Sequence, residues 1–228
     1  MTALERMRGG LVVSVQAPPG SPLRFPAHMA AIAQAAEAGG ACAIRAAGAE
    51  DIAAIKAAVD LPVVGLHKRH TPEGVRITPT LEDAEAVLAA GADVLAVDAT
   101  LRPRPDGLSP AEYVTDLRAR LGVPVLADVD DAASGTAATE AGADAVATTL
   151  SGYTDGAPPA GPDTALVAEL AVAVDCPVLA EGRYATSADV AAAFAAGAFA
   201  VVVGTAITDP VALTRGLASA TPEAHAHG

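Results

Sequence analysis

The chain has 228 residues, of which 52 % are hydrophobic and 3 % aromatic, and this is long enough to bury the core of one large domain or two small ones. Its formal net charge of −13 argues against binding nucleic acid or an anionic membrane through a general basic surface, so any anionic ligand must be held locally. No segment approaches about 18 uninterrupted apolar residues, and the start, MTALERMRGG, lacks the hydrophobic core of a secretory signal.

Short apolar runs alternate with Ala-rich amphipathic stretches along the whole chain. The apolar runs predict eight strands, which lie within the segments 9–17, 37–46, 59–68, 89–99, 121–130, 140–149, 174–182 and 195–204. The amphipathic stretches predict eight helices, near 27–38, 49–58, 81–90, 110–120, 131–141, 163–173, 186–196 and 210–219.

This strict alternation predicts the fold class. Strands that are apolar on both faces belong to a parallel sheet covered by helices. Eight such units predict an α/β fold, a (β/α)8 TIM barrel of the phosphate-binding type, with residues 1–228 as one domain and a short polar tail from about residue 220. An open doubly wound sheet shows the same alternation, but no G-x-G-x-x-G motif follows the first strand, so the barrel is favoured.

Polar side chains gather at the carboxyl ends of the predicted strands, where such barrels place their active sites. In chain order these residues are Gln16, Arg45, Lys68, Asp98, Asp128, Thr148, Thr149, Glu181, Gly204 and Thr205. A ring of charges is unfavourable to bury unless the charges pair or meet a ligand. The sequence therefore predicts a small-molecule site at the mouth of the barrel.

Lys68 is unusual because the chain otherwise prefers arginine. Of its 14 basic residues only Lys56 and Lys68 are lysines. An arginine cannot lose its proton in a protein, whereas a confined lysine can act as a base. Because side chains alternate along a strand, Lys68 and Glu181 both point inward if Leu66 and Leu179 do.

Two loops predict an anion site. Gly182 follows the seventh strand and Gly204 the eighth, and each loop leads to a helix start, with Ser187 and Asp209 as candidate caps. Backbone N–H groups at helix starts in these two loops form the usual phosphate site of this fold.

Two further loops can reach the mouth. The long Gly/Pro-rich segment 151–163, with Tyr153 as its only aromatic residue, predicts a lid or substrate-binding loop. The segment 101–110 could bring Arg102 or Arg104 over the mouth, and a solvated loop is an equal alternative.

Eight short stretches combine into a recognisable set: GGLVVSVQA, IRA, LPVVGLHKR, VDAT, ADV, TTLSGYT, PVLAEGR and VVVGTAIT. In this order, from about residue 8 to residue 215, they resemble the motifs of the bacterial N-acetylmannosamine-6-phosphate 2-epimerase family. The resemblance implies a barrel that interconverts N-acetylmannosamine 6-phosphate and N-acetylglucosamine 6-phosphate, as in amino-sugar and sialic acid catabolism, without a metal or other cofactor.

The resemblance also implies roles for individual residues. Lys68 takes the place of the catalytic lysine and Glu181 that of its partner carboxylate. The sugar-binding positions are Gln16, Arg45 and Asp128, and the phosphate-binding positions are Gly182, Arg183, Gly204 and Thr205. Many relatives read A-I-T-R-P where this chain reads A-I-T-D-P, so Asp209 replaces an arginine near the phosphate, and Arg183 is the candidate to supply the missing charge.

Epimerisation at carbon 2 of an open-chain sugar needs a base near neutral pKa and donors for the enolate oxygen. Lys68 can be that base if burial and Arg45 lower its pKa, although Glu181 and Asp128 oppose this. Glu181 would orient Lys68 and pass its proton, and a two-base scheme stays open. Arg45 or Gln16 would stabilise the enolate.

Three rival functions keep the same fold. A metal-dependent epimerase would use His67 with Asp98 and Asp128, but His67 faces away from Lys68 and such a centre needs more than one imidazole. An aldolase would use Lys68 to form a Schiff base. A non-catalytic sugar-phosphate sensor would not need a lysine at this position.

The partners expected from the sequence are few. A phosphorylated amino sugar is the expected ligand, and neither nucleic acid nor a membrane is expected to bind. A homodimer is an expectation that the sequence leaves open. Two cysteines, Cys42 and Cys176, beside apolar runs favour a reducing compartment, and the protein is expected to be cytoplasmic.

Overall fold

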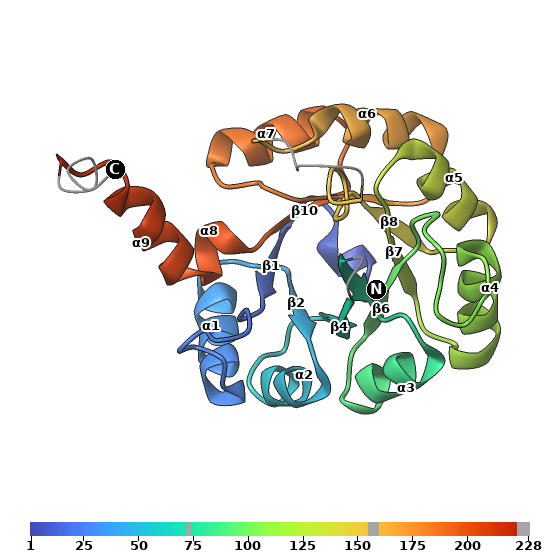
Figure 1. Cartoon of the computed structure of the whole chain (residues 1–228), viewed down its shortest axis with the longest axis horizontal. Coiled ribbons are helices and arrows are strands. Elements are labelled where there is room, and N and C mark those ends of the chain that lie inside the picture. The colour runs from blue at the N-terminus through green and yellow to red at the C-terminus, as the bar shows by residue number, and fades with distance from the viewer. Residues whose placement is uncertain (72–73, 155–159, 223–228) are drawn as a thin grey trace.

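Eight parallel strands close into a barrel in the computed structural model of the chain, which describes residues 1–71, 74–154 and 160–222 (Figure 1). The barrel strands are β1 Leu11–Val15, β2 Ala43–Ala47, β3 Val63–Leu66, β6 Val94–Asp98, β7 Val125–Asp128, β8 Ala145–Ala147, β9 Val178–Glu181 and β10 Ala200–Val203. They follow one another around the barrel in chain order, and β10 pairs back with β1. The predicted (β/α)8 barrel is confirmed, and the open sheet is excluded.

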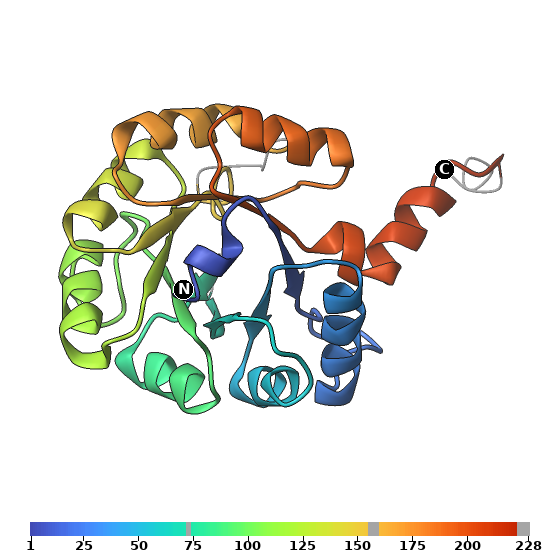
Figure 2. The same cartoon turned by 180° about the vertical axis from the view of Figure 1, so that it is seen from behind.

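Helices form the outer layer of the barrel (Figures 1 and 2). All eight predicted helices are present, as α1 Pro26–Ala38, α2 Ala49–Lys56, α3 Leu81–Ala89, α4 Pro110–Leu121, α5 Ala132–Glu140, α6 Thr164–Ala173, α7 Ser187–Ala195 and α9 Pro210–Ala218. The sequence pattern missed two short helices, η1 Glu5–Met7 and α8 Thr205–Thr208. Each is about one turn long, too short to show a periodic apolar face.

Side-chain caps fix where several of these helices begin. The Asp209 carboxylate accepts a hydrogen bond of 3.0 Å from the N–H of Ala212, so its predicted role as the cap of α9 is confirmed. The prediction of Ser187 as a cap was wrong, because Thr186 caps α7 and Ser187 is its first residue. The Thr186 hydroxyl accepts from the N–H of Asp189, which lies three residues further on.

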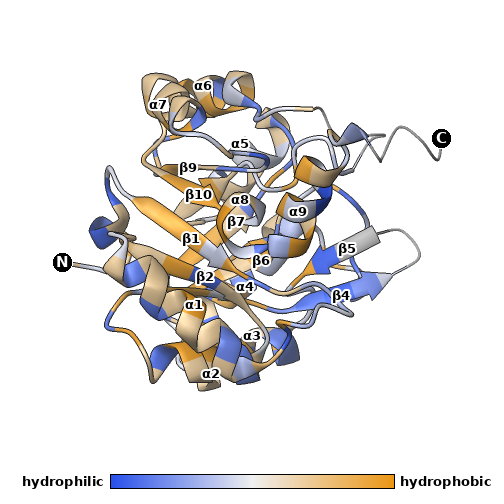
Figure 3. Ribbon diagram, turned by 90° about the vertical axis from the view of Figure 1, so that its left-hand side faces the viewer, coloured by the Kyte–Doolittle hydropathy of each residue, from blue (hydrophilic) through white to orange (hydrophobic). Residues whose placement is uncertain are grey.

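The strand expected to run through Lys68 ends at Leu66 instead. The strands β4 Lys68–Thr71 and β5 Gly74–Ile77 follow it and form an antiparallel hairpin outside the barrel sheet. Residues 68–70 are polar and exposed, so they do not continue a strand that is buried on both faces. Figure 3 shows this hydrophilic hairpin projecting from the end of the barrel opposite the N-terminus.

The hydrophobic core has two layers. Inside the barrel lie mostly small side chains, among them Val12, Ala43 and Ala145. Between the barrel and the helices lies a second and larger cluster. Short η1 covers the amino-terminal end of the barrel with the buried side chain of Met7 (Figure 2). The amino-terminal end is therefore closed by apolar contacts, which leaves the carboxyl end for polar groups.

The last helix does not join the outer layer. In Figures 1 and 2, α9 projects away from the barrel beyond α1. It has no buried residue, and its contacts are chiefly with α8. Part of the tail predicted from about residue 220 lies outside the described residues, so the single-domain organisation stays a prediction. Within the described ranges, no helix is long and apolar enough to cross a membrane.

Candidate active site

Inward-facing side chains become polar at the carboxyl end of the barrel. Leu66 and Leu179 belong to the cluster inside the barrel, as the alternation argument requires. Arg45 of β2 pairs in register with Ser14 of β1, and both side chains are buried. Asp98, Asp128 and Glu181 are the last residues of β6, β7 and β9, and their side chains are also withdrawn from water.

Arg45 is at the centre of a buried ion-pair cluster. Its Nη2 donates to Asp128 Oδ2 at 2.7 Å, and its Nε lies 3.3 Å from Glu181 Oε1. The side chains of Arg45, Asp128 and Glu181 are 1 %, 0 % and 12 % exposed, so all three are withdrawn from water. One buried cation faces two carboxyl groups, and it cannot fully compensate both if both ionise.

The two carboxyl groups respond to this environment in the same direction. Burial raises the pKa of Asp128 and the pKa of Glu181, and the Arg45 guanidinium opposes the shift in both. The Thr149 hydroxyl donates to Asp128 Oδ1 at 2.5 Å. The Thr148 hydroxyl fixes the main chain of Glu181, donating to its carbonyl at 2.8 Å and accepting from its N–H at 3.0 Å. Both carboxyls are thus held in place and biased towards the protonated form.

Lys68 reaches the same cluster from the first residue of β4. Its side chain is exposed at the open mouth, yet the surrounding protein crowds the amine. Burial lowers the pKa of Lys68, the Arg45 guanidinium lowers it further, and Glu181 and Asp128 oppose this. The sequence left this balance open, and in the structure it falls towards a lowered pKa. A lysine biased towards its neutral form is able to accept a proton.

Unpartnered polar atoms mark where a ligand would bind. Gln16 Oε1, Arg45 Nη1 and Glu181 Oε2 are buried and have no hydrogen-bond partner in the described part of the chain. Arg45 Nε makes no hydrogen bond either, although it lies 3.3 Å from Glu181 Oε1. The Gln16 amide nitrogen donates to Ser14 Oγ at 2.8 Å. Buried polar groups normally have partners, so atoms left without one around this mouth suit a ligand rich in hydroxyl, carbonyl or amide groups.

The two predicted anion loops lie at the ends of β9 and β10. Gly182 has φ 109°, a backbone conformation that a side chain would strain, and Arg183 follows it with φ 65°. Gly204 precedes α8, whose first residue Thr205 is exposed. The N–H groups of Gly182, Arg183 and Gly204 donate no hydrogen bond to any other described residue. These loops therefore offer free donors next to the mouth.

The guanidinium of Arg183 has a structural position that the sequence does not predict. Its Nε donates to the carbonyl of Gly161 at 2.6 Å and its Nη1 to that of Ser151 at 2.8 Å, so it joins the two ends of the 151–163 loop. The Tyr153 ring, 52 % exposed, lies 5.4 Å from the Arg183 guanidinium carbon. Residues 155–159 of this loop lie outside the described residues, so its role as a lid stays a prediction.

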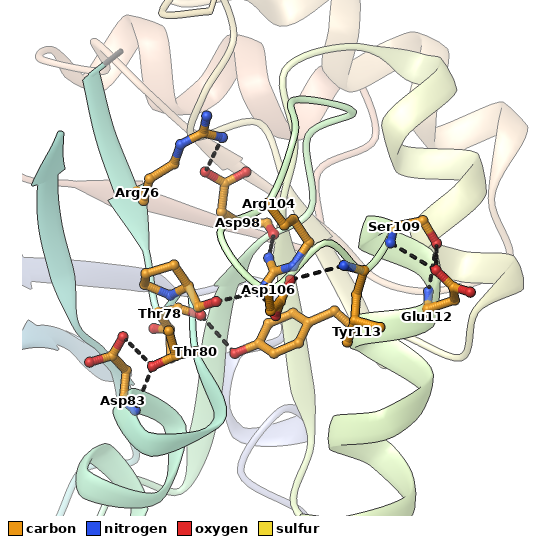
Figure 4. A network of polar contacts seen from close by, with 12 residues as sticks. Arg76, Thr78, Thr80, Asp83, Asp98, Arg104, Asp106, Ser109, Glu112 and Tyr113 are labelled. Carbon is orange, nitrogen blue, oxygen red and sulfur yellow. Dashed lines mark hydrogen bonds and ion pairs between the residues drawn. The ribbon is translucent and has the colours of Figure 1, made fainter. Parts of the chain in front are cut away.

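A second polar cluster surrounds Asp98 (Figure 4). Arg102 Nη2 lies 2.7 Å from Asp98 Oδ2, and Arg76 Nη1 lies 4.0 Å from the same atom. Asp98 is thus held by the hairpin and by the 101–110 loop. Arg104 donates to the main-chain carbonyl of Asp98 at 3.4 Å and stacks over the Tyr113 ring at 3.5 Å. The apolar pattern does not show the hairpin and so gives no sign of Arg76, although the T-P-E-G stretch at 71–74 is a turn signal.

Of the three residues of the metal-site alternative, Asp98 and Asp128 are register partners on β6 and β7, but His67 does not join them. His67 Nε2 lies 3.8 Å from Asp83 Oδ1, on the outer side of the barrel towards α3, whereas Asp128 binds Arg45 inside it. Within residues 1–71, 74–154 and 160–222, no group of three or more His, Cys, Asp or Glu side chains is placed to hold a metal ion.

Fold and site together define a (β/α)8-barrel protein with a buried cluster of ionisable side chains at the carboxyl end of its strands. Comparison with known proteins agrees with this class. Residues 29–223 match the family model described as "Putative N-acetylmannosamine-6-phosphate epimerase". The chain belongs to this family of isomerases of amino-sugar metabolism.

Individual relatives match over nearly the full chain. A protein from Cutibacterium acnes is 51 % identical over 91 % of this chain and 92 % of its own length, and one from Caldanaerobacter subterraneus is 45 % identical over 94 % and 92 %. Both are named "Putative N-acetylmannosamine-6-phosphate 2-epimerase". The solved N-acetylmannosamine-6-phosphate 2-epimerase from Clostridium perfringens superposes with a TM-score of 0.91 at 36 % identity, covering 97 % of both chains. These matches favour an epimerase over the aldolase and sensor alternatives.

Proposed function

We propose that this protein interconverts N-acetylmannosamine 6-phosphate and N-acetylglucosamine 6-phosphate by moving a proton at carbon 2 of the open-chain sugar. The observation that carries the proposal is the buried cluster in which Arg45 Nε lies 3.3 Å from Glu181 Oε1, close enough to Lys68 for the charges of both residues to act on its amine. The pKa of the amine is lowered and the pKa of the carboxyl is raised. Both shifts favour a neutral base facing a neutral acid, which is what proton exchange near neutral pH requires.

Lys68 serves as the base in this mechanism. The neutral amine takes the proton from carbon 2, the C–H electron pair forms the C1–C2 double bond, and the carbonyl electrons move onto the C1 oxygen. The resulting enolate carries negative charge on that oxygen. Arg45 donates a hydrogen bond to this oxygen, because its Nη1 has no partner among the described residues and its positive charge stabilises the enolate.

Glu181 supplies the second proton of the reaction. Its protonated carboxyl returns a proton to carbon 2 from the opposite face, and the enolate electrons move back to restore the carbonyl. Lys68 is then an ammonium and Glu181 a carboxylate. Proton transfer from Lys68 to Glu181 restores the starting state without a cofactor. Asp128 accepts hydrogen bonds from Arg45 and from the Thr149 hydroxyl, and these two contacts hold the cluster in position.

The remaining contacts follow the shape of the substrate. Gln16, Arg45 and Asp128 bind the sugar, and the N–H groups of Gly182, Arg183 and Gly204, with Thr205, bind the phosphate. Because the Arg183 side chain is engaged with loop carbonyls, its contribution to the phosphate comes through its backbone N–H. The exposed Tyr153 ring, packed near Arg183, closes the sugar site on the loop side.

Proton NMR of N-acetylmannosamine 6-phosphate in heavy water tests the proposal, because it reports epimer conversion and exchange at carbon 2 together. Lys68→Arg should abolish both signals, since arginine cannot act as a base at neutral pH. Lys56→Arg is the matched control, because Lys56 lies on α2 in an ion pair with Asp93. A Lys68→Arg variant that keeps more than about a tenth of normal turnover contradicts general-base catalysis, which contributes about 10²–10⁴-fold.

The role of Glu181 has its own test in the same assay. Glu181→Gln should keep exchange of the carbon 2 proton while losing conversion between epimers, since the amide cannot deliver the second proton. If exchange and conversion fall together, Glu181 only orients Lys68.

A homodimer is the assembly proposed for this chain. Four exposed apolar side chains lie on α8 and α9, namely Ile207, Val211, Leu213 and Leu217. The occupant proposed for this surface is a second copy of the chain, because α9 follows β10 in the chain position of the eighth barrel helix yet projects away from the barrel (Figure 1). Light scattering should give a dimer mass, lowered by Leu213→Asp but not by Val172→Asp on the distant helix α6. A monomeric mass of the unaltered chain refutes this assembly.

The proposed location is the cytoplasm. Cys42 and Cys176 are both free thiols, and a phosphorylated sugar is an intracellular metabolite.

A further inference from the structure

Lys68 is not held by the barrel sheet. The register of β3 with β2 ends at Leu66, and that with β6 ends at Gly65. Lys68 instead opens the hairpin, where it is paired with Ile77. A catalytic group must be held close to its productive geometry, so other residues must fix the segment that carries Lys68.

Thr78 fixes the main chain immediately before Lys68. Its N–H donates to the carbonyl of His67 at 2.6 Å, and its hydroxyl accepts from the N–H of His67 at 3.0 Å. Both main-chain polar groups of His67 are therefore bound to one residue. The same Thr78 hydroxyl donates to the carbonyl of Ala96 on β6 at 2.7 Å, which ties the base of the hairpin to the barrel.

Thr78 adopts an unusual backbone conformation in order to do this. Its φ is 46°, which is rare for a β-branched residue and strained, and the residue is fully buried. Its carbonyl accepts a hydrogen bond of 2.8 Å from the Tyr113 hydroxyl on α4 (Figure 4). All its polar groups are thus in use, and strain of this kind is stored chiefly at functional sites.

Asp83 fixes the side chains on either side of Lys68. Its carboxylate accepts two hydrogen bonds of 2.8 Å from Arg69, and its Oδ1 lies 3.8 Å from His67 Nε2. Because side chains alternate along an extended chain, holding His67 and Arg69 on the outer side turns Lys68 towards the mouth. Helix α3 can bring Asp83 this close because β3 has Gly65 at the contact, where an added Cβ would lie 2.7 Å from Val87 Cγ1.

We propose that Thr78 and Asp83 are positioning residues that together hold Lys68 over the Arg45 cluster, one through the main chain and the other through the flanking side chains. This inference rests on the proposed function, in which Lys68 is the base. It adds to that function two residues that touch neither substrate nor reacting atoms.

Thr78→Val tests the main-chain half, because valine has nearly the same shape but no hydroxyl. We expect kcat to fall on the order of 10²-fold, the loss that a displacement of about 1 Å produces, with KM nearly unchanged. The acid limb of the pH profile of kcat/KM should move to higher pH, because Lys68 displaced from its crowded site regains an ordinary pKa. Thr78→Ser, which restores the hydroxyl, should rescue both. Thr136→Val on the outer helix α5 is the matched control and should change neither.

Asp83→Asn tests the contacts with the side chains that flank Lys68. It gives an independent result even if Thr78→Val does not fold. It should lower kcat about tenfold with the same shift of the acid limb, since a neutral amide holds Arg69 less firmly. Folded Thr78→Val and Asp83→Asn variants with kcat within about threefold of normal and an unchanged pH profile would overturn the inference. Activity in Lys68→Arg would instead refute the proposed function itself, so the two failures are distinguishable.

Discussion

Replacing Arg45 by methionine removes the cation between two buried carboxyl groups while keeping much of the side-chain volume. Arg45 lies 2.7 Å from Asp128 and 3.3 Å from Glu181 and is 1 % exposed. Removing one partner of a buried ion pair lowers the free energy of unfolding by about 3–5 kcal/mol. For a chain of this length that corresponds to a loss of about 6–20 °C in Tm, at about 2–4 °C per kcal/mol.

The loss should depend on pH in a defined direction. Without Arg45, the pKa of Asp128 and the pKa of Glu181 rise further above their unfolded-state values of about 3.9 and 4.3. Near those values both carboxyls are protonated in the folded state, so the loss of the cation matters least. As pH rises through the folded-state pKa values, the unfolded chain ionises freely and the folded state does not, so stability falls.

Thermal unfolding followed by circular dichroism at about pH 5 and about pH 8 measures this effect. The matched control is Arg118→Met, because Arg118 pairs with Asp144 at 2.5 Å but is 40 % exposed. An exposed pair contributes at most about 1 kcal/mol, with little dependence on pH in this range. If Arg45→Met loses no more stability than Arg118→Met, or loses equally at both pH values, Arg45 does not compensate buried charge.

Four further predictions concern activity. The pH profile of kcat/KM should be bell-shaped. It should rise as Lys68 loses its proton at a lowered pKa and fall as Glu181 loses its proton at a raised pKa. A rise that continues to the ordinary lysine pKa of 10.5 contradicts the mechanism. Turnover should survive exhaustive treatment with a chelator, and loss of turnover that added divalent metal restores would revive the metal-dependent alternative. Gly204→Val should raise KM for the phosphorylated sugar about tenfold, because a side chain there crowds the backbone N–H groups. It should also lower Tm, because its first carbon would lie 3.3 Å from Ser14 Cβ. Free N-acetylmannosamine should be turned over poorly, and equal turnover of both sugars at equal concentration would mean that the β9 and β10 loops hold no phosphate.

The local pattern of the sequence determined much of this protein. Eight apolar runs that alternate with amphipathic stretches predicted the barrel, because strand and helix formation depend on neighbouring residues and on burial of both strand faces. Alternation then placed Glu181 inside, since inward and outward positions repeat every two residues whatever the rest of the fold does. The cap formed by Asp209 was readable for the same reason, because it involves only the three residues that follow.

Tertiary structure alone decided which of these groups meet. The hairpin of β4 and β5 follows from a turn that the apolar pattern does not show. Other contacts join residues that are far apart in the chain, namely those of Thr78 with β6 and α4 and that of Arg183 with the 151–163 loop. Whether α9 packs on the barrel depends on the surface beside it, and the apolar periodicity of the helix does not show this. The face to which a side chain points follows from its position within one strand. The distance between side chains of different strands depends on how the barrel closes and on the path of the loops. For that reason the sequence could identify Lys68 but not what holds it.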